Sequence, residues 1–174
     1  VAKMNSIVHS AEEIVMTGRT PYQGRFEGIS IGDKEAVYRA FSLTKADKLK
    51  DKKFAILSGG EKQKIVIARA VAQSTPWMLL DEPIASLDIK NQIEIMQTLS
   101  ELNRQEGVSV LMVLHDINLA GIYCDRLIML KDGQVIAAGN TNECLCEENL
   151  KKLYDISFFH MDTKKGQRYY YAEI

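Results

Sequence analysis

The 174-residue sequence has no excess of charge of either sign and no long hydrophobic run. Its 22 basic and 23 acidic residues give a formal net charge of −1, which indicates no general electrostatic attraction to nucleic acid or to an anionic membrane. The longest apolar runs, 109–114 and 127–130, have the length of β-strands and are too short to span a bilayer. We therefore expect no nucleic-acid partner and no direct insertion into a membrane.

Cysteine is scarce, and the sequence lacks a leader-like segment. The three cysteines (Cys124, Cys144 and Cys146) are odd in number and give no disulfide framework, as in proteins of a reducing cytoplasm. Cys144 and Cys146 could form half of a metal site, but no companion His or Cys lies at ligand spacing, so we expect structural thiols. The first residues, VAKMNSIVHSAEE, lack the uninterrupted apolar region of a signal peptide. A start at Val1 leads us to expect that the chain begins partway into a longer polypeptide.

Residues 1–56 are predicted to form a helical subdomain and a connector. Ser10 and Glu13 have the spacing of a capping box at a helix start, and residues 19–26 are predicted to be a loop. A second helix is expected from near Asp33, with its apolar face formed by Ala36, Val37, Ala40 and Phe41. Residues 44–53 hold five lysines interleaved with acids, which favours a solvated connector over a nucleic-acid patch.

After Leu57 the pattern changes to alternating helices and strands. Strand, long helix and strand over residues 77–114 form a βαβ unit, which predicts a mostly parallel sheet covered by helices. Lys131-Asp132-Gly133 predicts the turn of a hairpin. The expected elements are helices at 60–73, 88–105 and 143–154, and strands at 78–80, 108–114, 126–130, 134–138, 157–161 and 168–172. The helix at 88–105 is expected to end at Gly107 and to have an apolar face formed by Ile89, Ile93, Met96, Leu99 and Leu102. The predicted divisions are the region 1–56, a core over 57–140 and a C-terminal helix and strand extension over 141–174.

The first candidate for chemistry is Ser58-Gly59-Gly60-Glu61. Ser58 and Glu61 have capping-box spacing, and the two glycines allow another molecule to approach the backbone closely. A helix N-terminus offers free amides and the positive end of a dipole, which suit a phosphate. Taken alone, this pattern is more often a simple cap.

The second candidate is the acid pair that follows Trp77-Met78-Leu79-Leu80. Asp81 and Glu82 are expected at the carboxyl end of a strand, where open α/β sheets bind ligands. Asp81 would hold Mg²⁺, directly or through water, and Glu82 would orient and deprotonate the water that attacks a γ-phosphate. The alternative is that both acids only begin a turn.

The third candidate is His115, at the end of the next predicted strand. A lone His in this position is usually structural. If its strand neighbours the one that ends at Asp81, its imidazole can reach the same phosphate.

Together these segments resemble the ABC-type ATPases. LSGGEKQ is similar to the signature motif of that family, MLLDEP to its Walker B motif, ASLD to its D-loop, and His115 to its switch histidine. Ser58, Asp81, Asp88 and His115 follow one another at offsets of 23, 7 and 27 residues. The resemblance implies an α/β fold of the P-loop NTPase class, with an N-terminal helical subdomain and a C-terminal β-hairpin.

The resemblance also implies a division of labour between two ATPase subunits that pack head to tail around two ATP molecules. Ser58, Gly59, Gly60 and Glu61 would bind the ATP held by the partner subunit, in trans. Asp81, Glu82 and His115 would act, with Mg²⁺, on the ATP of their own subunit. Communication across the dimer would involve Ser86 and Asp88.

Within the family, TGRTPYQGRF and DINLAGIYCDRLIMLKDG are similar to ATPase subunits of importers for ferric siderophores, haem and cobalamin. Such a subunit binds a membrane permease from the cytoplasmic side, so the resemblance implies a peripheral position on the inner face of the cell membrane. Two other interpretations stay open: a non-transport ABC ATPase, and a non-catalytic regulatory or interaction protein with this fold.

One family motif has no counterpart in the sequence. No G-x-x-x-x-G-K-[ST] loop occurs among the 174 residues, and the adenine-stacking aromatic and the Gln-bearing loop are missing too. All three belong to the family's N-terminal third. Without the amides and lysine of such a loop, the β- and γ-phosphates lose most of their ligands. We therefore expect this polypeptide alone neither to bind ATP tightly nor to hydrolyse it at a family-like rate. We also expect an unpaired sheet edge near residues 108–114, which would favour association.

Overall fold

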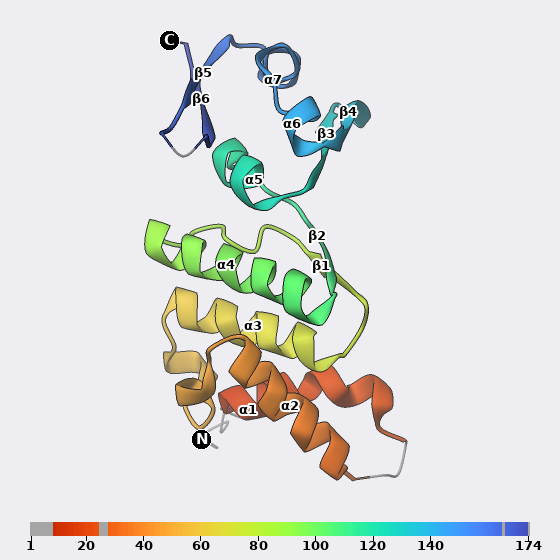
Figure 1. Ribbon diagram of the computed structural model, residues 1–174. Coiled ribbons are helices and arrows are strands. Elements are labelled where there is room, and N and C mark those ends of the chain that lie inside the picture. The colour runs from red at the N-terminus through yellow and green to blue at the C-terminus, as the bar shows by residue number, and fades with distance from the viewer. Residues whose placement is uncertain (1–8, 25–27, 165, 174) are drawn as a thin grey trace, which may run out of the picture. The chain divides into compact units, whose positions relative to one another are not determined.

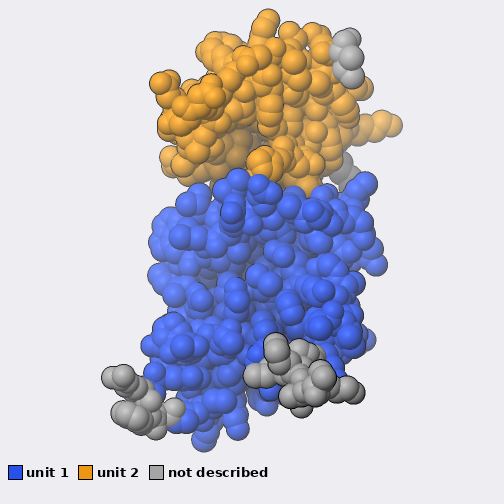
Figure 2. All heavy atoms as spheres, turned by 180° about the vertical axis from the view of Figure 1, so that it is seen from behind, with its two compact units in different colours: residues 1–113 blue, residues 114–174 orange. Residues whose placement is uncertain are grey.

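The computed structural model describes residues 9–24, 28–164 and 166–173 (Figure 1). The chain forms two compact units, residues 1–113 and residues 114–174, coloured separately in Figure 2. Each unit has a hydrophobic core of its own. We describe the two units one at a time.

Unit 1 begins with helices that surround a shared apolar core. The three predicted helices are present, and α3 packs against both α1 and α2 (Figure 1). The core includes Val15, Val37, Phe41 and Ile65, each at most 1% exposed. The elements are α1 (Ala11–Met16), the 3₁₀ helix η1 (Thr17–Tyr22), α2 (Ile31–Leu43), the 3₁₀ helices η2 (Asp47–Leu49) and η3 (Phe54–Ile56), and α3 (Gly59–Ala72).

Hydrogen bonds from capping boxes fix the starts of these helices. The predicted box of Ser10 and Glu13 is confirmed at α1. At α2 the helix begins two residues before the predicted Asp33, because Ser30 is its N-cap and Asp33 completes a further capping box. In each box a side chain satisfies backbone amides that have no partner within the helix.

Two predictions for the N-terminal region need correction. The 3₁₀ helix over residues 17–22 includes residues 19–22 of the expected loop 19–26, while Arg25 and Phe26 of that loop lie outside the described residues. The connector 44–53 is not fully solvated, because Thr44, Ala46 and Leu49 are buried between its exposed lysines. Ala46, the N-cap of η2, and Leu49, its last residue, both belong to the helical core.

The βαβ prediction is confirmed. Strand β1 (Trp77–Leu80) pairs in parallel with β2 (Ser109–Met112), and helix α4 (Ile89–Glu106) connects them. Gly107 ends α4 in the left-handed conformation, with φ of 68°, as expected of a glycine stop. The predicted apolar face of α4 is wrong at its start, since Ile89 and Ile93 are exposed. The buried residues of α4 are Ile95, Met96, Thr98, Leu99 and Leu102, and towards the helix start this stripe continues through the partly buried Asn91 and Gln92.

Only one face of the β1–β2 pair is covered. Met78 is 5% exposed, whereas its strand neighbours Trp77 and Leu79 are 61% and 72% exposed. Leu111 lies opposite Leu79 in the register and is 53% exposed, so the open face is apolar. Within the described residues β1 and β2 pair only with each other, which agrees with the expected unpaired edge.

The described residues of unit 2 form two antiparallel strand pairs and three helices. Asp132 and Gly133, with φ of 50° and 75°, form the predicted tight turn of the first hairpin. Met129, Cys144, Leu145, Leu150 and Tyr170 form the core. The elements are α5 (Ile117–Tyr123), β3 (Arg126–Lys131), β4 (Gln134–Asn140), α6 (Thr141–Cys144), α7 (Glu147–Tyr154), β5 (Phe158–Asp162) and β6 (Arg168–Ala172).

Strand pairing differs from the expected mostly parallel sheet. The described residues form one parallel pair, β1–β2, and two antiparallel pairs, β3–β4 and β5–β6. The physical reason is the connections: a parallel pair needs a crossover such as α4, while short turns join the strands of the other two pairs. No helix among the described residues is both long enough and apolar enough to cross a membrane.

Candidate functional site

Ser58 stands at the start of α3 and is held by a closed set of hydrogen bonds. Its hydroxyl accepts from the backbone N–H of Glu61 at 3.3 Å, and its own N–H donates to Glu61 Oε2 at 2.9 Å. Lys52 Nζ lies 3.2 Å from the other carboxylate oxygen of Glu61. The Ser58 amide, and then Lys52, hold the pKa of Glu61 below its ordinary value. The predicted capping box is therefore confirmed, with Glu61 ionised inside it.

Asp81 and Glu82 leave β1 at its carboxyl end, as predicted. The N–H of Val113 donates to the Leu80 carbonyl at 3.0 Å, which extends the parallel pairing to the last residue before the acids. Both acidic residues are exposed, whereas Pro83 and Ile84 immediately after them are buried. The two buried residues anchor the loop, so the acids are presented to solvent at the strand end.

The loop between β1 and α4 carries backbone strain. Glu82 and Ser86 have φ of 45° and 59°, in the left-handed region that non-glycine residues seldom occupy. The N–H of Ala85 donates to the Glu82 carbonyl at 3.1 Å, and the side-chain amide of Gln92 donates to the Ile84 carbonyl at 3.4 Å. Unfavourable conformations of this kind cluster at functional sites, and here they fall on two predicted site residues.

Asp88 is the N-cap of α4, and both of its oxygens are bound by Asn91. Asp88 Oδ1 accepts from the backbone N–H of Asn91 and Oδ2 accepts from its side-chain amide, each at 2.8 Å. These two bonds, the backbone one first, hold the pKa of Asp88 below its ordinary value. Asp88 is thus ionised and fixed in one orientation relative to the first turn of its helix.

The structure brings the start of α3 and the start of α4 together. A Cβ atom placed on Gly60 would lie 2.2 Å from Asn91 Oδ1, and one placed on Gly59 would lie 3.7 Å from Leu87 Cδ2. One helical turn further on, Lys64 of α3 pairs with Glu94 of α4 at 2.7 Å. The predicted in-trans nucleotide residues and the predicted communication residue Asp88 therefore meet at one corner of unit 1, which we call the α3–α4 corner (residues 58–61 and 86–91).

His115 belongs to unit 2, whereas Asp81 and Glu82 belong to unit 1. It is exposed and directly precedes Asp116, whose carboxylate caps α5 by accepting from the N–H groups of Asn118 and Leu119 at 2.8 and 2.9 Å. This cap fixes the backbone beside His115. Its approach to a phosphate bound at Asp81 and Glu82 stays a prediction.

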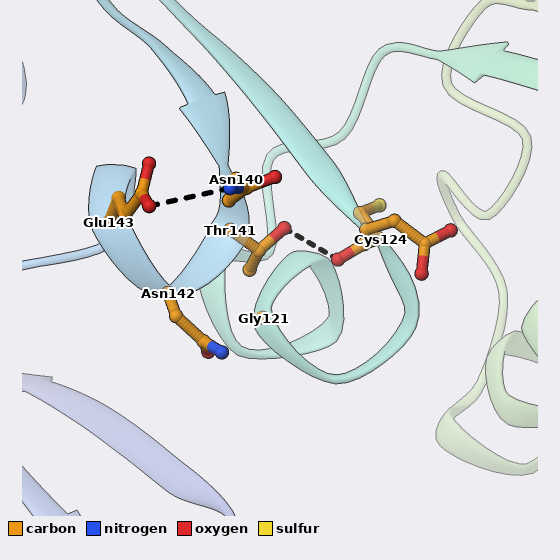
Figure 3. Close-up of a pocket in the computed structure, with 7 residues that line it drawn as sticks. Gly121, Cys124, Asn140, Thr141, Asn142 and Glu143 are labelled. Atoms are coloured by element: carbon orange, nitrogen blue, oxygen red, sulfur yellow. Dashed lines mark hydrogen bonds between the residues drawn. The ribbon is translucent and has the colours of Figure 1, made fainter.

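A polar cavity of about 440 Å³ in unit 2 contains none of the predicted site residues. Figure 3 shows the Thr141 side chain turned to Cys124 and that of Asn140 to Glu143. Thr141 Oγ1 donates to the Cys124 carbonyl at 2.5 Å, and Asn140 Nδ2 donates to Glu143 Oε1 at 3.3 Å. Burial, and then Asp125, raise the pKa of the Cys124 thiol to about 11, so the thiol is protonated at neutral pH.

Three contacts of unit 1 were not predicted from the sequence. Lys52 binds Glu61, and Arg19 Nε donates to Asp33 Oδ1 at 2.9 Å while its guanidinium also donates to the Ala72 carbonyl at 2.8 Å. The third contact is Asn91 with Asp88. Only the last had a local signal, because residues i and i+3 at a helix start have capping geometry. Lys52 and Glu61 are nine positions apart, and Arg19 is 14 positions from Asp33 and 53 from Ala72.

Comparison with known proteins agrees with this geometry. The family profile described as ABC transporter matches residues 4–85. Over most of its length the chain is similar to the ATP-binding proteins of ABC transporters.

Individual relatives give the same result. The ferric enterobactin transport ATP-binding protein FepC of Escherichia coli is 39% identical over 153 residues, which are 88% of this chain and 56% of that protein. A solved metal-chelate type ABC transporter in an inward-facing conformation matches 99% of this chain and 70% of its own, with TM-score 0.91 and 26% identity. The dimeric bacterial cassette MJ0796 matches 81% of this chain and 61% of its own, with TM-score 0.64 and 32% identity. The chain spans about half the length of the curated relatives it matches.

Proposed function

We propose that this chain is part of the ATP-hydrolysing subunit of an ABC importer for a ferric siderophore, haem or cobalamin. The observation that carries the proposal is the α3–α4 corner, where the signature-like glycines and the N-cap acid Asp88 meet. The acids Asp81 and Glu82 stand at the carboxyl end of β1 in the same unit. A relative named for ferric enterobactin transport, and a solved metal-chelate type transporter, support the substrate class.

In the proposed subunit, one set of residues binds the ATP of the partner subunit and another set acts on the ATP of its own subunit. Gly59 and Gly60 carry the backbone amides of the first turn of α3, at the positive end of the helix, and Ser58 carries a hydroxyl beside them. This set suits the γ-phosphate of ATP held by a partner subunit. The dimeric cassette among the solved relatives supports the pairing of two such subunits. Glu61 takes part indirectly, since its carboxylate is engaged by Ser58 and Lys52 and keeps the first turn closed.

The remaining residues act on the nucleotide of their own subunit. Glu82 orients and deprotonates the attacking water, and His115 holds the γ-phosphate and the base in place. Ser86, in its left-handed conformation, and Asp88 carry communication across the dimer. The strained backbone at Glu82 supports a role for this residue beyond that of a turn.

Mg²⁺ fits the residues present at the end of β1. Asp81 offers an exposed carboxylate, and Mg²⁺ is usually held by one or two carboxylates, several waters and the phosphates of the substrate. Asp81 would hold the ion directly or through water. The ion, when bound, neutralises charge that develops on the phosphates.

The proposed partners are a second ATPase subunit and a membrane permease. The subunit would lie in the cytoplasm on the inner face of the cell membrane, bound to the permease and not inserted in the bilayer. The alternative of a non-catalytic protein with this fold rests on one observation, the lack of a G-x-x-x-x-G-K-[ST] loop in the 174 residues.

The experiment has a genetic and a transport arm. The DNA upstream of the Val1 codon is sequenced; an in-frame G-x-x-x-x-G-K-[ST] loop supports the proposal, and a stop codon favours the non-catalytic alternative. The gene is then disrupted, and uptake of radiolabelled ferric siderophore, haem and cobalamin is measured. We expect one uptake to fail, and to be restored by the wild-type gene but not by the Glu82→Gln gene. Unchanged uptake of all three would contradict the substrate class.

A further inference from the structure

Gly60 has no room for a side chain, because Asn91 lies against it. Gly60 is buried in the first turn of α3, with a conformation that any residue could adopt, so its backbone does not require glycine. Its surroundings do: an added Cβ would lie 2.2 Å from Oδ1, 2.4 Å from Cγ and 3.0 Å from Nδ2 of Asn91. The Asn91 carboxamide therefore occupies the position that a side chain at residue 60 would need.

The same carboxamide is fixed from its other side. Asn91 Nδ2 donates to Asp88 Oδ2 and the Asn91 backbone N–H donates to Asp88 Oδ1, both at 2.8 Å. Asn91 thus cannot turn away from Gly60 without giving up a charge-assisted hydrogen bond to Asp88. Asp88, Asn91 and Gly60 form a continuous contact between the two predicted functional segments.

The contact is supported on both sides. Leu87 approaches Gly59 at ordinary van der Waals distance, and Lys64 binds Glu94 at 2.7 Å one turn further along both helices. The starts of α3 and α4 are therefore joined at successive turns, with Asn91 as the polar contact closest to the exposed helix ends.

We propose that Asn91 is a positioning residue, which couples the Asp88 loop to the phosphate-facing turn of α3 so that the two segments move together. The inference rests on the proposed function for its consequence, because the coupled segments would face the partner subunit's nucleotide. Asn91 itself touches Asp88 and Gly60, and it acts through them.

The first test is nuclear magnetic resonance on the ¹⁵N-labelled 174-residue chain. We expect Asp88→Asn to shift the amide signal of Gly60 in the wild-type background, and to leave that signal in place in an Asn91→Ala background. Asp116→Asn, which alters the equivalent N-cap of α5, is the matched control and should not move the Gly60 signal. Equal shifts with and without Asn91, or no shift at all, would overturn the proposal.

The second test fills the space at Gly60 with a methyl group and then enlarges that space by truncating Asn91. Gly60→Ala should lower the unfolding temperature of the wild-type chain, and the loss should largely disappear when Asn91→Ala makes room. Gly59→Ala, whose added methyl makes an ordinary contact, is the matched control and should not lower it. A Gly60→Ala loss of equal size in both backgrounds would overturn the proposed contact. If Gly60→Ala does not fold, the amide measurements still decide.

The third test asks for the functional consequence. In the uptake assay, Asn91→Ala should reduce transport on the order of tenfold or more at equal protein level, since small misplacements in a catalytic assembly are costly. Gln97→Ala, an exposed position on the same helix, should transport like wild type. Full transport by Asn91→Ala would overturn the positioning role. Absence of wild-type transport for every substrate would instead refute the proposed function, while the amide test would still decide whether the coupling exists.

Discussion

The α3–α4 corner and the β1–β2 pair lie in the same unit but differ in one respect. The polar groups of the corner have hydrogen-bond partners, whereas many apolar side chains of the strand pair are exposed. At the corner, Ser58 and Glu61 are joined by two hydrogen bonds, and Asp88 and Asn91 by two more. In the β1–β2 pair one face is buried, while the opposite face exposes large apolar side chains: Trp77, Leu79, Leu111 and Val113.

The difference follows from the range of the interactions involved. Capping bonds join residues three positions apart, so a short segment that contains both partners can form them. Burial of a sheet face needs another layer of structure from elsewhere in the fold. The predicted phosphate-facing turn can therefore be complete in this chain while the sheet beside it leaves an apolar face open.

The largest expected effect separates the two faces of β1. Met78→Ala should lower the free energy of unfolding by about 2–5 kcal/mol, because the Met78 side chain is only 5% exposed and its removal leaves a cavity. Leu79→Ala, at the next residue, should change it by less than about 0.5 kcal/mol, since that side chain is already 72% exposed. Urea unfolding of both variants, at a concentration low enough for the chain to be monomeric by light scattering, measures the contrast. Similar losses at the two positions in the monomer would contradict the open face of β1.

The second expected effect is on association. The open apolar face and the unpaired strand edges should make the 174-residue chain self-associate. The double variant Leu79→Lys with Leu111→Lys should reduce the mass seen by light scattering, because it places charge on that face. Ile31→Lys, at a position 78% exposed on α2, is the control and should leave the mass unchanged. A wild-type chain that stays monomeric at high concentration would refute this prediction.

The smallest expected effect concerns the cap at the α3–α4 corner. Because the pKa of Asp88 is lowered in the folded chain, its ionised form stabilises the fold at pH values above its ordinary pKa of 3.8. That contribution is lost as the pH falls below 3.8 and through the folded-state pKa. The Asn91 amides lower the pKa of Asp88 most, and Lys90 lowers it further.

Thermal unfolding of wild type and Asp88→Ala from about pH 7 down to about pH 3 tests the cap. The variant should melt a few degrees lower at neutral pH, and the difference should narrow in acid. A difference that is independent of pH would show that the Asp88 charge contributes nothing to the cap.

Predictability from the sequence follows the same division between short-range and long-range interactions. The boxes at Ser10 and Ser58, the stop at Gly107 and the Asp132-Gly133 turn depend on adjacent residues, and all four are confirmed. Ile89 and Ile93 fitted a helical apolar face, yet they are exposed because the start of α4 turns Asn91 and Gln92 inward. Which residues the start of α4 buries depends on the residues of α3 that lie against it, such as Gly60 beside Asn91.

The candidate site shows the same pattern. The acids after β1 and the signature-like turn of α3 were predicted from local sequence, and the structure places them at a strand end and a helix start. The approach of Asn91 to Gly60 was not predicted, since nothing near residue 60 in the chain indicates what lies 31 positions later. Such contacts become visible only when two helices are packed together.

The central claim is that the 174 residues include the proposed signature turn and the proposed catalytic acids Asp81 and Glu82, but no G-x-x-x-x-G-K-[ST] loop that would hold a nucleotide beside those acids. Phosphate release by the purified 174-residue chain, with ATP and Mg²⁺, tests this claim most directly. We predict no release above the level of the Glu82→Gln variant. Robust turnover that Glu82→Gln abolishes would contradict the account, because it would require the chain to bind the β- and γ-phosphates without a P-loop.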